Sequence, residues 1–190
     1  MVEIPIALNF LGSLKNGERI LEVGNVLDYY SPVKGKEVVD KYETMPGVLN
    51  VDIVDYNPET RYDAIVSVST MEHVGFDETP IDCDKTAKSI LKLFDLVKPG
   101  GRIMITVPTC YNPKIDEFIR LYGSKFTKLH FLSQLKDRWR WFEVSELKLS
   151  ECHLLRFWCM NHKIYSKLAP CLPILFIAPY GQKAYLIMFL

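Results

Sequence analysis

Four short segments follow one another between residues 19 and 73, and each of them has an apolar strand core that ends in a polar or acidic residue. In order along the chain they are RILEVGNV, EVVDKYE, VLNVDIVDY and YDAIVSVSTMEHV. A small α/β domain builds a nucleotide pocket in this way, because the ligand lies across the carboxyl ends of parallel strands. The pattern therefore predicts a parallel sheet with polar side chains gathered at one edge.

The spacing of these segments predicts an α/β fold that is reduced in its first half. We expect strands over 19–23, 37–39, 48–51 and 62–68, and the links between the first three are too short for full crossover helices. Further along, we expect a helix over 82–97, ended by the turn KPGG, then a strand over 102–107 and a helix opened by Asn112-Pro113. Strands that alternate with helices indicate a Rossmann-like, mostly parallel central sheet with helices on both faces.

The C-terminal part gives weaker signals. WRWFEVSELKL and KAYLIMFL are typical of closing strands. KDRWRWFEV is basic and aromatic, but its alternation favours an amphipathic strand over a nucleic-acid site. Between them, LAPCLPILFIAP is expected to pack over the pocket, to contact an apolar acceptor or to form a homodimer surface. The sequence shows no convincing domain boundary, so we expect a single domain over residues 1–190.

The overall composition excludes several classes of partner. Basic and acidic residues balance at 23 each, so no global positive field attracts nucleic acid or an anionic membrane. The first residues lack the features of a secretory signal, and no segment has the roughly 18 uninterrupted apolar residues of a membrane span. We expect a cytoplasmic protein.

The five cysteines are scattered and odd in number, which argues against a disulfide framework. Cys152, His153, Cys159 and His162 bring zinc into consideration, but C-x-H is a poor chelate spacing. We favour buried free thiols and expect no metal.

Gly24 stands at the end of the first expected strand, where a glycine lets a ligand approach the backbone closely. Its loop does not contain G-x-G-x-x-G, which argues against NAD or FAD. Asp40 follows at about the distance where nucleotide folds place the acid that binds ribose hydroxyls. An exposed turn aspartate is the alternative for Asp40, and Glu43 is a second candidate for the same role.

The order of these motifs, with STMEHV and KPGG after them, resembles the class I S-adenosylmethionine (SAM)-dependent methyltransferases over most of the first 112 residues. EVGN through DKYE and STMEHVG also resemble a smaller methyltransferase group associated with glycan or cell-surface biosynthesis. The resemblance departs from the family pattern at the first loop. Members usually show an acidic residue followed by several spaced glycines, whereas here Glu22 is followed by Gly24 and Asn25.

The resemblance implies a role for several further residues. Asp52 would bond the adenine amino group and Ile53 would pack on the ring, with Asp55 as the competing acid. Ser69 would lie beneath the methionine part of SAM. His73 would accept a proton from the acceptor, since its ordinary pKa lies near neutrality; a structural role is the alternative. Glu72 has a further interpretation as a helix-start acid.

The sequence thus favours a SAM-dependent methyltransferase that acts on an O or N atom of a small-molecule or glycan acceptor and releases S-adenosylhomocysteine (SAH). The expected cofactor-binding residues are Glu22, Gly24, Asn25, Asp40, Asp52, Ile53 and Ser69, and the expected catalytic residue is His73. The main alternative is a catalytically inactive SAM- or SAH-binding regulatory protein on the same fold. A nicotinamide-dependent enzyme is a third and less favoured interpretation.

Overall fold

An eight-stranded sheet forms the centre of the computed structural model, which describes residues 2–108, 111–134, 141–144 and 184–189. Its strands in chain order are β1 (Ile20–Val23), β2 (Lys36–Val39), β3 (Val48–Leu49), β4 (Tyr62–Val68), β5 (Val97–Pro108), β6 (Lys128–Gln134), β7 (Trp141–Val144) and β8 (Ala184–Phe189). Across the sheet the order is β3-β2-β1-β4-β5-β8-β6-β7. The first five strands pair in parallel and the last three pair antiparallel. The prediction of an α/β fold with a mostly parallel sheet is confirmed.

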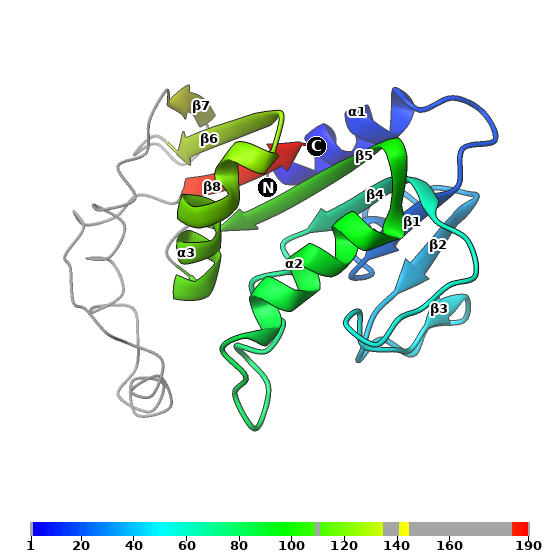
Figure 1. Cartoon of the computed structure of the whole chain (residues 1–190). Helices are drawn as coiled ribbons and strands as arrows, with labels where there is room; N and C mark the ends of the chain where they lie inside the picture. Colours follow the sequence, from blue (N-terminus) through cyan, green and yellow to red (C-terminus); the bar gives the residue numbers. More distant parts are fainter. Residues whose placement is uncertain (1, 109–110, 135–140, 145–183, 190) are drawn as a thin grey trace.

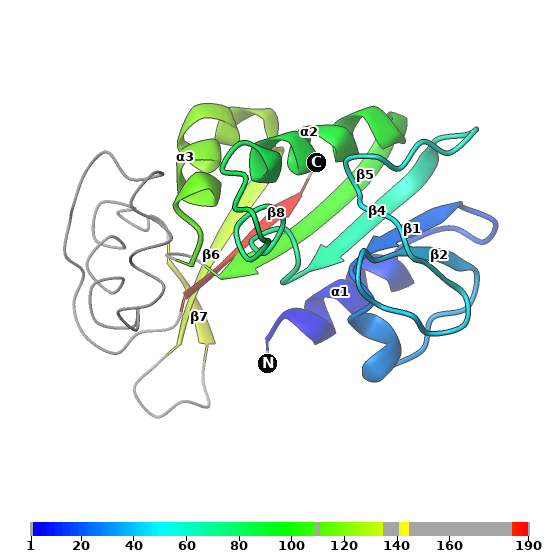
Figure 2. The ribbon, with the colours of Figure 1, turned by 90° about the horizontal axis from the view of Figure 1, so that it is seen from below.

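Helices cover both faces of this sheet, as expected (Figure 1). α1 (Glu3–Gly12) lies on one face, and α2 (Lys85–Leu96) and α3 (Pro113–Tyr122) lie on the other (Figure 2). Two single 3₁₀ turns complete the described elements, η1 (Leu27–Tyr29) and η2 (Gly123–Lys125). The chain therefore forms a three-layer sandwich with the sheet in the middle.

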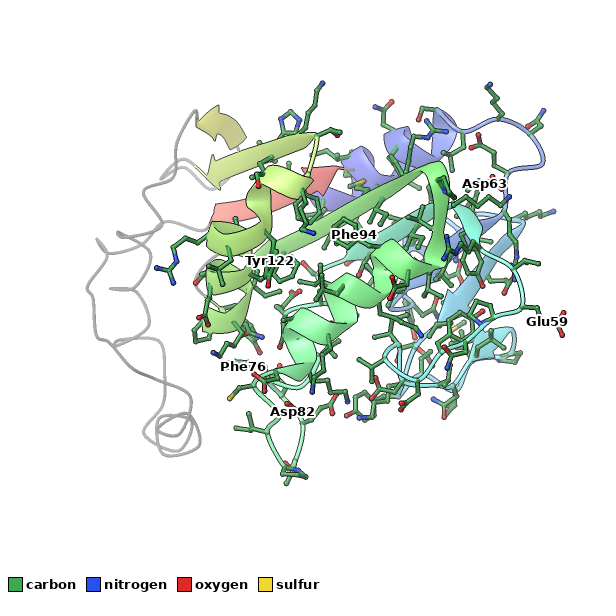
Figure 3. All side chains as sticks on the ribbon, viewed as in Figure 1. Glu59, Asp63, Phe76, Asp82, Phe94 and Tyr122 are labelled. Carbon is green, nitrogen blue, oxygen red and sulfur yellow. The ribbon has the colours of Figure 1, made fainter. Side chains whose placement is uncertain are left out.

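The strands alternate their side chains between two cores, one on each face of the sheet. Leu21, Ile65 and Ile103 belong to the core under α2 and α3, whereas Ala64 and Met104 belong to the core under α1. This follows from the period of two residues in a strand, which sends neighbouring side chains to opposite faces. Phe94 of α2 and Tyr122 of α3 lie over the same face of the sheet (Figure 3). Burial on both faces accounts for the unbroken apolar runs in the sequence.

The elements of the first half lie close to where the sequence predicts them. β4 matches the expected strand 62–68, and the single turn η1 fills the link in which only one or two helical turns were expected. β3 is shorter than expected, with only two residues. α3 begins as predicted, because the side chain of Asn112 accepts a hydrogen bond from the backbone N–H of Lys114 at 2.9 Å and Pro113 opens the helix.

Two elements of the structure have no counterpart in the sequence-based predictions. α1 buries Ile4, Ala7, Phe10 and Leu11, which recur at helical spacing, but the N-terminal residues were considered only as an absent secretory signal. β6 was not expected either. The turn KPGG also differs, because α2 ends at Leu96 and residues 97–108 are already strand. Gly100, with φ of +75°, lies where the β4–β5 register shifts.

Several expectations concern residues outside the described ranges. The segment LAPCLPILFIAP lies there, and so do the candidate metal residues Cys152, His153, Cys159 and His162. Cys83 is disulfide-bonded, which departs from the expectation that the scattered cysteines do not form disulfides. Within the part of the chain that the structure describes, no helix is long and apolar enough to cross a membrane.

A buried ion pair ties β1 to β2. The Nζ atom of Lys36 lies 2.7 Å from Oε2 of Glu22 and 2.8 Å from Oδ1 of Asp28. The Glu22 side chain is fully buried, and that of Lys36 is 2% exposed. Two charges of opposite sign so far from water depend on each other, because an unpaired buried charge is strongly unfavourable.

Replacement of Lys36 with Met is expected to lower the free energy of unfolding by about 3–5 kcal/mol, since it leaves the Glu22 carboxylate buried without its ammonium partner. Urea-induced unfolding measures this loss. The exposed Lys34, changed to Met, serves as the control and is expected to stay within about 0.5 kcal/mol of the parent protein. Equal losses in the two variants would contradict the role given to the pair.

Candidate functional site

A cavity of about 500 Å³ opens at the carboxyl ends of β1, β2 and β4. Small-molecule sites commonly have this size, and sheets of this kind bind ligands at this edge. Six of the eight residues proposed from the sequence line it: Gly24, Asp40, Asp52, Ile53, Ser69 and His73. The sheet thus brings together residues that lie up to 49 positions apart in the chain.

Gly24 forms the floor of the cavity where the ends of β1 and β4 approach each other. Its φ is +86°, in the left-handed region. A Cβ atom at this position would lie less than 3.0 Å from three side-chain atoms of Thr70. Both the backbone conformation and the close contact therefore require glycine here.

Glu22 and Asn25 are not among the residues that line the cavity. Oε1 of Glu22 accepts hydrogen bonds from the backbone N–H groups of Val26 at 3.0 Å and Leu27 at 2.8 Å. Asn25 is buried, and its backbone N–H donates to Asp40 at 3.2 Å. Both residues thus stabilise the loop after β1 through these hydrogen bonds and do not line the cavity.

Asp40 stands at the end of β2 with its carboxylate at the cavity wall. Its Oδ1 accepts from the backbone N–H groups of Tyr42 at 2.8 Å and Glu43 at 2.9 Å, and its Oδ2 accepts from Asn25. A carboxylate has about four lone-pair positions, so capacity remains for a ligand hydroxyl. Glu43, the second candidate, also lines the cavity, and its Oε2 accepts from the hydroxyl of Tyr29 at 2.5 Å.

Asp52 and Ile53 lie beyond Asp40, after β3. The side chain of Ile53 is buried at the cavity wall. The carboxylate of Asp52 contacts the ammonium groups of Lys85 at 2.5 Å and Lys41 at 3.0 Å. Burial works against ionisation, but the hydrogen bonds from Lys85 and then Lys41 outweigh it, so the pKa of Asp52 lies below its usual value. Asp52 is therefore an ionised acceptor.

Ser69 turns the chain at the end of β4 in an unusual conformation. Its φ is +43°, the one positive φ of a residue other than glycine in the described ranges. The backbone N–H of Ser69 donates to the carbonyl of Thr106 at 2.9 Å, and its hydroxyl donates to Glu3 at 2.7 Å. These bonds hold a backbone that costs energy, which is typical of functional sites.

Two buried acids lie behind this turn. Glu3, from α1, also accepts from the hydroxyl of Thr106 at 2.6 Å. The carboxyl group of Glu72 is 1% exposed, and its Oε2 has no hydrogen-bond partner among the residues that the structure describes. Burial, with the nearby charges of Glu3 and Asp77, raises the pKa of Glu72 to about 8. Glu72 is thus held largely as the neutral acid at neutral pH and does not act as an exposed helix-start acid.

His73 is half exposed at the mouth of the cavity and is fixed by its neighbours. Its Nδ1 is hydrogen-bonded to Oδ2 of Asp77, which also accepts from the hydroxyl of Tyr111 at 2.7 Å. The rings of His73 and Tyr111 meet edge to face, with centroids 5.1 Å apart. Nε2 of His73 lies 3.7 Å from Oε1 of Glu72. An Asp77 carboxylate on Nδ1 favours the tautomer in which Nε2 carries the lone pair.

Sequence reasoning missed four residues that shape this site. Glu3 comes from the unpredicted helix α1, where a lone acid among apolar residues was the available signal. Lys41, Lys85 and Glu78 come from separate segments, so only the folded chain brings them together. Lys41 and Lys85 each form short ion pairs with both Asp52 and Glu78.

Comparison with known proteins establishes the fold alone. No family model matches the chain, and no curated protein matches its sequence. Among solved structures, a phosphoethanolamine N-methyltransferase 2 from Haemonchus contortus, in complex with phosphomonomethylethanolamine and SAH, is 15% identical with a TM-score of 0.50. That match covers 98% of this chain and 51% of that protein, so the chain spans about half its length.

Two further solved structures match at lower TM-scores. A functionally unknown protein from Deinococcus radiodurans R1 is 14% identical over 98% of this chain and 85% of its own, with a TM-score of 0.48. A SAM-dependent methyltransferase from Clostridium acetobutylicum is 12% identical over 98% and 89%, with a TM-score of 0.42. The chain has the fold of the class I SAM-dependent methyltransferases, on the basis of the Haemonchus structure and the sheet order.

Glu72 gives the site a measurable pH dependence. A group whose pKa is higher in the folded than in the unfolded chain stabilises the fold below its unfolded pKa, near 4.5, and loses this contribution as the pH rises through about 8. Relative to Glu72→Gln, which stays neutral, the parent protein is therefore expected to lose about 3–5 kcal/mol between pH 5 and 9. Denaturant unfolding at each pH measures the difference, and parallel pH profiles would contradict it.

Proposed function

We propose that this protein is a SAM-dependent methyltransferase that acts on an O or N atom of a small-molecule or glycan acceptor. The observation that carries the proposal is the cavity at the strand ends, which Gly24, Asp40 and Asp52 all line. The sheet order supports it, because β3, β2, β1 and β4 are neighbours and a ligand across their ends meets these residues in turn.

The residues present fit an adenosyl group joined to an amino acid. Gly24 leaves room at the backbone where a Cβ would collide with Thr70. Asp40 retains acceptor capacity for a ribose hydroxyl, and Asp52 and Ile53 offer an anion and an apolar surface for the base. The amino-acid part would lie toward Ser69 and Thr70, at the end of β4.

Bound SAM supplies a methyl group on a positively charged sulfur, so no nucleophilic side chain of the protein is required. The protein positions the acceptor, and positioning supplies much of the rate in such reactions. His73 would accept the proton that the acceptor O–H or N–H releases. Asp77 would hold the ring so that Nε2 is the accepting atom, and it would stabilise the charge that the ring gains.

One observation favours a second candidate, a SAM- or SAH-binding protein without catalysis. Both ring nitrogens of His73 face carboxyl groups, Asp77 on one side and Glu72 at 3.7 Å on the other. A histidine held in this way also fits a purely structural role. Binding of SAH without methyl transfer to any acceptor supports this second candidate.

Calorimetric titration with SAH tests the proposal, with NAD and ATP as control ligands. We expect saturable binding of SAH and none of NAD. Replacement of Asp40 with Asn is expected to weaken SAH binding about tenfold or more, since it removes a charged acceptor of ligand hydrogen bonds. The exposed Asp95, changed to Asn, is the matched control and should leave the affinity unchanged, since it does not line the cavity.

A second pair of variants separates the effect of the close contact between Gly24 and Thr70 from the effect of backbone strain. Gly24→Ala and Gly47→Ala place an alanine at φ of +86° and +90°, but only the first meets a neighbouring side chain. The proposal expects loss of SAH binding in the first variant alone. A folded parent protein that gives no heat with SAH would contradict the proposed function.

A further inference from the structure

Four charged side chains form a closed ring at one end of the cavity. Nζ of Lys41 lies 3.0 Å from Oδ2 of Asp52 and 2.8 Å from Oε2 of Glu78. Nζ of Lys85 lies 2.5 Å from each of the same two oxygens. Each ammonium group therefore bridges both carboxylates, and each carboxylate receives both ammonium groups. The ring carries no net charge.

The ring joins segments that are otherwise separate. Lys41 follows β2, Asp52 follows β3, and Lys85 opens α2. Glu78 belongs to the loop between β4 and α2, which is bracketed by Phe76 and Asp82 in Figure 3. Oε1 of Glu78 also accepts from the backbone N–H of Gly75 at 3.3 Å, which fixes the carboxylate within its own loop.

Burial strengthens these ion pairs, because water screens them less. The side chains of Asp52, Glu78 and Lys85 are only 12–13% exposed. Burial opposes ionisation of Glu78, but the bonds from Lys41 and Lys85 hold its pKa below the usual value, and those from Lys85 and Lys41 do the same for Asp52. Networks of charges that are partly removed from water are stronger than single surface pairs.

The ring occupies one oxygen of Asp52 and leaves the other open to a ligand. Both ammonium groups contact Oδ2. Oδ1 accepts one hydrogen bond among the described residues, from the backbone N–H of Val54 at 3.3 Å. A carboxylate oxygen accepts two, so Oδ1 retains a lone pair, and Asp52 lines the cavity next to the buried Ile53.

Resting on the function proposed above, we infer that Lys85 and Glu78 are positioning residues that fix the Asp52 carboxylate, so that Oδ1 faces the exocyclic amino group of adenine and the site rejects a 6-oxo purine. An amino group donates to Oδ1. An oxo group at the same position would bring two acceptor atoms together, which leaves both without a donor. Selectivity then depends on the orientation of one carboxylate, which the ring maintains.

Lys85 is the informative position for a test, because it contacts Asp52 but does not line the cavity. The affinities of SAH and of S-inosylhomocysteine, which has an oxo group in place of the adenine amino group, are measured by calorimetry. We expect the parent protein to prefer SAH by about ten- to a hundredfold, the effect of one hydrogen bond to a charged group. Lys85→Met is expected to reduce this preference at least about threefold while SAH still binds.

Two further variants complete the experiment. Lys88→Met, at an exposed position of the same helix, is the control and should keep the preference of the parent protein. Glu78→Gln keeps the shape of the side chain but removes one charge of the ring, and it should reduce the preference in the same direction. Because Glu78 itself lines the cavity, the ratio of the two affinities, and not the affinity for SAH, decides the question if Lys85→Met does not fold.

The outcomes separate this inference from the proposed function. An unchanged preference in a folded Lys85→Met or Glu78→Gln variant would overturn the role of the ring. Equal binding of the two ligands by the parent protein would also overturn it, yet would leave the SAM site intact. Failure of the folded parent protein to bind either ligand would overturn both.

Discussion

The carboxylate of Glu22 holds the loop on which the cavity depends. One of its oxygens accepts two backbone N–H groups from the turn after Gly24, and the other meets the buried ammonium of Lys36. The loop contains one glycine, and the hydrogen bonds to Glu22 hold its backbone in place. Gly24 can then approach Thr70 closely, and the floor of the cavity is formed. The sheet fixes where the strands end, and Glu22 fixes how the first of them turns.

Charged groups around the cavity are divided into two systems with different chemistry. At the far end from β4, Lys41 and Lys85 neutralise Asp52 and Glu78 and keep them ionised. Beside Ser69, no lysine or arginine of the described residues forms an ion pair with Glu72, and burial holds this carboxyl group largely neutral. One end is thus suited to firm recognition through a charged acceptor. The other end has His73 and the neutral acid Glu72, an arrangement that suits proton transfer or a structural role equally.

The sequence was informative wherever a local pattern carried the signal. The apolar run 62–68 and the Asn112-Pro113 cap are local, and both elements formed as expected. The strand-end positions of Gly24, Asp40 and Asp52 followed from the same pattern, because parallel strands place their carboxyl ends at one edge. The sequence was uninformative where contacts are distant. The bond of Glu3 to Ser69 spans 66 positions, and the ring around Asp52 draws on four segments.

Glu22 illustrates a subtler difference between pattern and structure. Its place in the EVG motif suggested a cofactor contact, but its side chain is fully buried, does not line the cavity, and binds the backbone of the turn after Gly24 and the ammonium of Lys36. The motif therefore predicted the position of the loop correctly, and the Glu22 side chain stabilises this loop without lining the cavity. Asn25 likewise does not line the cavity, but its backbone N–H donates a hydrogen bond to Asp40, which does.

The central claim is that the cavity at the carboxyl ends of β1, β2 and β4 is a SAM site. The most direct measurement is a crystal structure of the protein grown with SAH. The account predicts SAH in this cavity, with its ribose hydroxyls in hydrogen-bond contact with Asp40 and its adenine between Asp52 and Ile53. SAH bound elsewhere, or bound in the cavity with its base directed toward His73, would contradict the account.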